Sequence, residues 1–173
     1  MESKTGFYIG DLVLGANDGI ITSFAVISGA AGAGLPAFVV IVLGLANLIA
    51  DGISMGLSNY LSLESTREAE ERAGISEKRL NHLSKHGLAT TLAFSSAGIL
   101  PLIPYFFNIS PSSQFFVAIA ATAISLFAVG ASRTIVTGIY WLRSGLEMLL
   151  VGGFAALAAY GVGAAVKAFF GIM

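Results

Sequence analysis

The sequence contains no cysteine, few charged residues and no strong excess of either sign of charge. The absence of cysteine excludes disulfide bonds, thiolate metal sites and iron–sulfur clusters. Charged residues make up only 11% of the 173 positions, and 55% are hydrophobic, which is more apolar surface than a soluble domain of this size could bury. A net charge of −1 produces no field that would attract a polyanion. The composition therefore excludes an ordinary soluble domain, a disordered tail and a nucleic-acid-binding protein.

The charges are distributed unevenly and leave three long stretches without any charge, at 19–50, 87–132 and 148–166. Such runs are typical of membrane-spanning helices, which need about 20 residues each. Turn-forming residues divide the first two runs, and none of the segments alternates as a membrane β-barrel strand does. We therefore expect an all-α integral membrane protein, a single domain of five transmembrane helices at about 8–31, 36–63, 87–106, 113–137 and 144–170.

Basic residues gather in two of the connections between these helices. A short charged connector at 64–86 holds more than half of them, and Arg133 and Arg143 flank the connection between the fourth and fifth helices. Lys4 precedes the first helix, whereas Lys167 stands almost alone on the other side. Because cytosolic loops carry an excess of Lys and Arg, we expect a cytosolic N-terminus and a C-terminus on the opposite side of the membrane.

Carboxylates inside the expected spans are the strongest functional signal. Asp18 lies near the middle of the first helix and Asp51 near the middle of the second, where an unpaired acid costs several kcal/mol. Glu147 lies near the start of the fifth helix. An amide, a carboxylate, a thioether and a second amide recur every four residues along one stripe of the second helix: Asn47, Asp51, Met55 and Asn59. Oxygen ligands combined with a thioether favour a transition metal over calcium or magnesium.

Four of the candidate ligands also have a purely structural interpretation. Asp18 and Asp51 could be hydrogen-bonded to Ser or Thr inside the bundle, and Met55 could fill a gap in the core. Glu147 could form an ion pair with Arg143, four residues earlier. These alternatives stay open at the level of the sequence.

Two further patterns allow two interpretations each. His82 and His86 have the spacing of a helical metal site, but the segment around them could equally be a solvated charged surface. Small residues spaced as GxxxG let membrane helices approach closely, either within one chain or in a homodimer formed through the first helix. These glycines are Gly15 and Gly19 in the first helix and Gly52 and Gly56 in the second.

Four segments resemble, in order, the motifs of the vacuolar iron transporter family of Fe²⁺/H⁺ exchangers: 18–26, 47–61, 101–107 and 145–153. The resemblance implies a homodimer with the metal pathway between the subunits, and a metal role for Asp18 and Met55. Some eukaryotic members have a glutamate at the position of Asn47, and Asp51 could replace that charge. Larger members insert a cytosolic metal-binding domain, for which the connector at 64–86 is too short.

From these observations we expect export of Fe²⁺, or Mn²⁺, from the cytosol in exchange for protons. The expected partners are the metal ion, protons, membrane lipid and a second copy of the chain, without a prosthetic group or nucleic acid. The short form favours a prokaryotic plasma (inner) membrane. The alternatives are a channel without proton coupling and a non-transporting scaffold. An enzyme is not expected, because Asp18 follows Asn17 and Asp51 follows Ala50, unlike the motifs of intramembrane aspartyl proteases.

Overall fold

The computed structural model describes residues 4–74 and 82–171, and in these ranges it consists of helices and short connections without a strand. This confirms the prediction of an all-α protein. The helices run in the order α1 (Lys4–Ala33), α2 (Ala37–Arg72), α3 (Leu83–Gly98), the 3-10 helix η1 (Leu100–Phe106), α4 (Pro111–Ser132), α5 (Thr134–Thr137) and α6 (Trp141–Phe170).

Four of these helices, α1, α2, α4 and α6, are long and apolar enough to cross a membrane. A fifth span results when α3 and η1 are taken together, with a bend of 41° between them. Pro101 and Pro104 lie in η1, and a proline ring removes a backbone donor and interrupts an α-helix. The protein is thus an integral membrane protein of four spans, or of five when one of them is bent, while the side on which each terminus lies stays a prediction.

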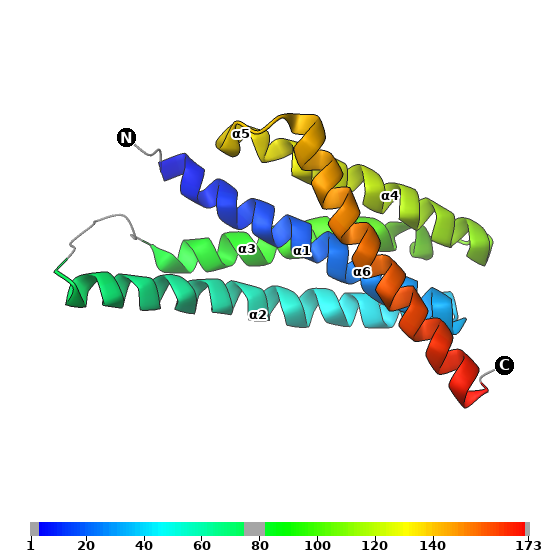
Figure 1. The fold of residues 1–173 in the computed structure, drawn as a ribbon. Coiled ribbons are helices and arrows are strands. Elements are labelled where there is room, and N and C mark those ends of the chain that lie inside the picture. The colour runs from blue at the N-terminus through cyan, green and yellow to red at the C-terminus, as the bar shows by residue number, and fades with distance from the viewer. Residues whose placement is uncertain (1–3, 75–81, 172–173) are drawn as a thin grey trace.

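Helix α1 is the centre of the bundle and contacts α2, α3, α4 and α6. Figure 1 shows α2 lying alongside α3, and α6 crossing α1 obliquely. A Cβ atom added at Gly15 or Gly19 would collide with the backbone oxygens of Thr90 and Phe94 in α3. Of the two interpretations of this spacing, contact within one chain is therefore the one that holds for Gly15 and Gly19, because α3 of the same chain occupies that face.

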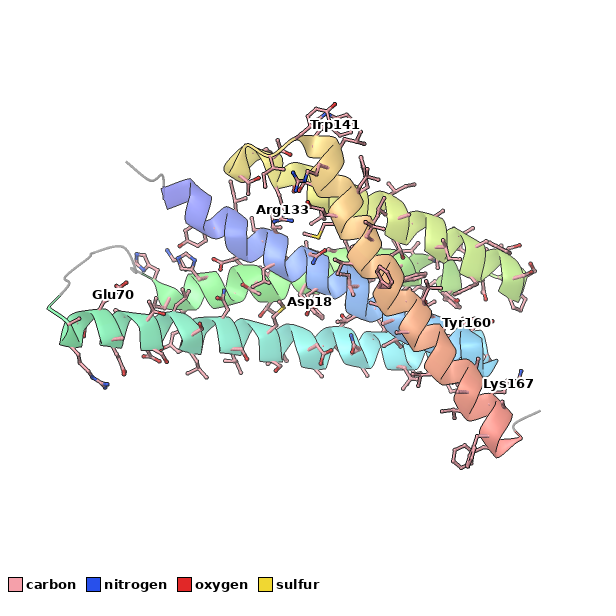
Figure 2. All side chains as sticks on the ribbon, viewed as in Figure 1. Asp18, Glu70, Arg133, Trp141, Tyr160 and Lys167 are labelled. Atoms are coloured by element: carbon pink, nitrogen blue, oxygen red, sulfur yellow. The ribbon has the colours of Figure 1, made fainter. Side chains whose placement is uncertain are left out.

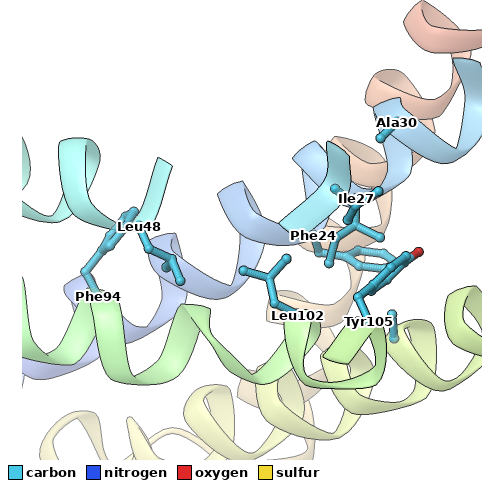
Figure 3. Close-up of a cluster of buried hydrophobic side chains, with 9 residues drawn as sticks. Phe24, Ile27, Ala30, Leu48, Phe94, Leu102 and Tyr105 are labelled. Carbon is cyan, nitrogen blue, oxygen red and sulfur yellow. The ribbon is translucent and has the colours of Figure 1, made fainter. Parts of the chain in front are cut away.

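The hydrophobic core lies where α1, α2, α3, η1 and α4 meet. Figure 3 shows the cluster, whose buried members are Phe24, Ile27, Ala30, Val40, Leu48, Phe94, Leu102, Tyr105 and Ala118. Most large apolar side chains of α6 point outward instead, and Phe154 is 73% exposed. Apolar surface of this extent is not left to water, and it suits contact with lipid.

The charged connector differs from the expectation at both of its ends. Helix α2 continues past Leu63 to Arg72, and α3 already begins at Leu83. Ion pairs four residues apart, Arg67 with Glu71 and Arg72 with Glu68, line the last turns of α2. The middle of the connector, 75–81, lies outside the described residues.

Candidate metal site

Asp18 and Asp51 are brought close to each other by α1 and α2. Asp18 is half-buried near the middle of α1, on the side toward α2 (Figure 2), and Asp51 is near enough for its charge to act on Asp18. Asp51 itself is exposed on the surface of the single chain. Within residues 4–74 and 82–171, neither carboxylate receives a hydrogen bond or an ion pair from protein. Both acids are therefore available to a ligand.

The other three residues of the stripe on α2 lie in different surroundings. Met55 is half-buried and packs against the core cluster. The amide nitrogen of Asn47 is buried without a hydrogen-bond partner in the described part of the chain. The amide nitrogen of Asn59 instead donates to Asp11 Oδ1 at 2.8 Å and to Thr90 Oγ1 at 2.7 Å. Asn59 lies eight residues from Asp51, about 12 Å along the helix, and belongs to a second polar cluster.

Glu147 is exposed on α6, and its Oε1 lies 3.1 Å from Nε of Arg143. This ion pair is the structural alternative that the sequence left open. An exposed pair of this kind contributes little to stability. No group of three or more His, Asp or Glu side chains suited to a metal ion occurs among the described residues, so Glu147 does not join Asp18 and Asp51 within one chain.

A buried polar cluster links α1, α2 and α3 two turns from Asp18. His86 Nδ1 lies 2.5 Å from Asp11 Oδ2, and the side chains of both residues are buried. The ring of Tyr8 stacks on that of His86, with centroids 4.2 Å apart and planes 2° from parallel. His82 and His86 do not share one surface, so their spacing does not form a metal site, because His86 turns inward to Asp11 whereas His82 is exposed.

Together the helices and these groups define a class: a helical membrane protein with ionisable side chains inside its spans, which is typical of proteins that move ions or protons. The model of the VIT family matches residues 9–83 and 69–164. The chain belongs to the VIT family, and the resemblance seen in the sequence is confirmed.

Known relatives carry the same family name. Over 162 residues the chain is 30% identical to vacuolar iron transporter homolog 2 of Oryza sativa subsp. japonica, covering 87% of this chain and 86% of that protein. It is 25% identical over 219 residues to vacuolar iron transporter 1 of the same plant, covering 94% and 87%. It is 27% identical over 221 residues to the vacuolar iron transporter of Toxoplasma gondii, covering 90% and 73%.

The alignment lengths bear on the expectation that this chain lacks the cytosolic domain of larger family members. The alignment with vacuolar iron transporter 1 extends over 219 positions, more than the 173 residues of this chain. That relative therefore has residues without a counterpart here, which is consistent with a short form. The relatives are named for the vacuole, so a prokaryotic plasma membrane stays a prediction.

Proposed function

We propose that this protein transports ferrous iron across the membrane, with Asp18 and Asp51 as its central ligands. The observation that carries the proposal is the pair of neighbouring membrane carboxylates that lack a protein partner, in a chain of a family whose relatives are named iron transporters. The thioether of Met55 and the side-chain oxygen of Asn47 complete the proposed ligand set on α2. Asn59 and Glu147 are left out, because Asp11 and Arg143 engage them.

The proposed transporter is a homodimer joined through the face of α2 that carries Asp51. Ser54 and Ser58 are exposed on the same face, three and seven residues further along the helix. A carboxylate and two hydroxyls would be costly to expose to lipid hydrocarbon. We therefore propose that the same polar face of a second subunit packs against this one. Two copies would place four carboxylates around one axis and form a site that a single chain lacks.

Proton exchange follows from the chemistry of the ligands. A carboxylate must be deprotonated to bind a metal ion, so metal binding and protonation compete at the same oxygens. We propose that Asp18 and Asp51 load Fe²⁺, or Mn²⁺, from the cytosol and release it on the far side when protons reach them. The metal ion is cargo in this cycle, and the helices supply the two states of access.

Reconstituted vesicles test this proposal directly. Fe²⁺ entry and internal pH are recorded together for the wild type, Asp18→Asn, Asp51→Asn and the control Glu68→Gln, which removes an exposed acid at the end of α2. We expect coupled Fe²⁺ and proton movement in the wild type and the control, and none in the two Asp variants. Fe²⁺ flux without proton movement would indicate a channel instead. Unchanged transport by Asp18→Asn would exclude the proposed site.

A further inference from the structure

Another polar feature is a cavity between α1, the end of α4 and α6. The cavity has a volume of about 360 Å³, and α1 lines one wall with Ile9, Val13 and Asn17. Arg133 and Thr137 line the end formed by α4 and α5, and Met148 lines the side formed by α6. The cavity thus combines apolar walls with one cation, and the part of α1 that lines it is the first half of that helix.

Arg133 is the unusual member of this lining. The other arginines within residues 4–74 and 82–171 each pair with a glutamate, as Arg143 does with Glu147. Arg133 has no acidic partner in these ranges although it is half-buried. Figure 2 shows its side chain directed from the end of α4 toward α1. A half-buried guanidinium without a counter-ion is stabilised by an anion, and its planar fork suits the oxygens of a phosphate.

A second unpartnered group lines the same cavity. The side-chain oxygen of Asn17 is buried and has no hydrogen-bond partner among the described residues. It can accept from a hydroxyl group but not from the phosphodiester of a lipid, which carries no proton to donate. A ligand that carries both a phosphate and a hydroxylated headgroup would therefore satisfy Arg133 and Asn17 together.

We propose that this cavity binds an anionic phospholipid, with its phosphate on Arg133 and an acyl chain along the apolar wall. Basic pockets between membrane helices at the membrane surface are suited to such headgroups. The exposed apolar residues Leu14 and Leu146 on α1 and α6 leave a path for the chain to the surrounding lipid. Free inorganic phosphate would satisfy the cation but would leave the apolar wall without a partner. The proposal is independent of the metal that the protein carries.

Native mass spectrometry of the purified protein tests the inference, with phosphatidylglycerol and phosphatidylcholine added in turn. We expect the wild type to retain phosphatidylglycerol preferentially, and Arg133→Gln to lower that retention about fivefold. Arg133→Lys keeps the charge and is expected to retain the preference. The control Arg143→Gln removes an equally basic residue at the same end of the bundle but outside the cavity, and it is expected to bind as the wild type does.

The other outcomes overturn the proposal. Equal losses in Arg133→Gln and Arg143→Gln would mean that surface charge alone attracts the lipid. Displacement of phosphatidylglycerol by millimolar inorganic phosphate would mean that the ligand is a free anion. A dimer that retains no lipid in any variant would mean that the second subunit fills the cavity.

Discussion

His86 and Asp11 form a buried pair, with Nδ1 of the imidazole 2.5 Å from Oδ2 of the carboxylate. The pair joins the first turn of α3 to α1, and Asn59 of α2 donates to the other oxygen of the same carboxylate. Hydrogen bonds to one carboxylate therefore connect α1, α2 and α3 near the end of the bundle where α1 begins. The exposed fractions of 8% for Asp11 and 3% for His86 mean that the pair is shielded from water in the folded protein.

We predict that His86→Ala lowers the melting temperature strongly. The substitution leaves the Asp11 carboxylate buried with a single donor, and breaking one side of a buried pair costs about 3 kcal/mol. Thermal unfolding in detergent, followed by circular dichroism, measures the effect. His82→Ala serves as the control because His82 is exposed in the same region, and its melting temperature is expected to stay at the wild-type value. Equal melting temperatures for the two variants would contradict a stabilising role for the Asp11–His86 pair.

The sequence predicted the spans well because the information for them is local. Uncharged runs and turn-forming residues mark membrane helices wherever they occur in a chain. The pairing of Asp11 with His86 could not be predicted in this way, because 75 positions separate the two residues and no periodic pattern connects them. Which residue pairs with Asp11 depends on how α3 packs against α1.

The candidate ligands show the same limit. The four-residue spacing on α2 predicted a shared stripe, yet Asn59 faces Asp11 while Asp51 faces outward. A long helix contacts different neighbours along its length, so one stripe passes through several surroundings. Likewise, the GxxxG spacing predicted close approach of helices but could not tell a contact within the chain from one between chains.

Gly19→Ala is predicted to destabilise the fold, although alanine normally has a higher helix propensity than glycine, by about 1 kcal/mol. The added methyl group would meet the backbone of Phe94, which cannot move as a side-chain end can, so α1 and α3 would separate. Gly161→Ala is the control, because a Cβ there would have no atom of another helix within 4 Å among the described residues. Melting temperatures in detergent should fall for the first variant and hold or rise for the second. A fall in both would assign the effect to a cause other than helix contact.

Disulfide cross-linking is predicted to join two chains through Ser54→Cys. The chain has no cysteine of its own, so a disulfide formed by a single-cysteine variant is always intermolecular, and one between two copies gives a band at twice the mass of the chain. Ser54 lies on the exposed face that carries Asp51, whereas Phe154→Cys places the thiol on the outward face of α6. Mild oxidation in membranes followed by non-reducing electrophoresis should give a dimer band for Ser54→Cys alone. Dimers of Phe154→Cys alone would move the interface to α6.

Met55→Leu is predicted to reduce Fe²⁺ transport severalfold while leaving the melting temperature near the wild-type value. The two side chains have similar volumes, and such core exchanges cost less than about 1.5 kcal/mol, so the contact of Met55 with the core should persist. What disappears is the thioether, a soft ligand that suits a transition metal. Met148→Leu, which removes a half-buried thioether of α6, controls for the loss of sulfur itself. Equal rates of Fe²⁺ transport by the two variants would mean that Met55 serves only to pack the core. The carboxylates of Asp18 and Asp51 and the side-chain oxygen of Asn47 would then have to hold the ion.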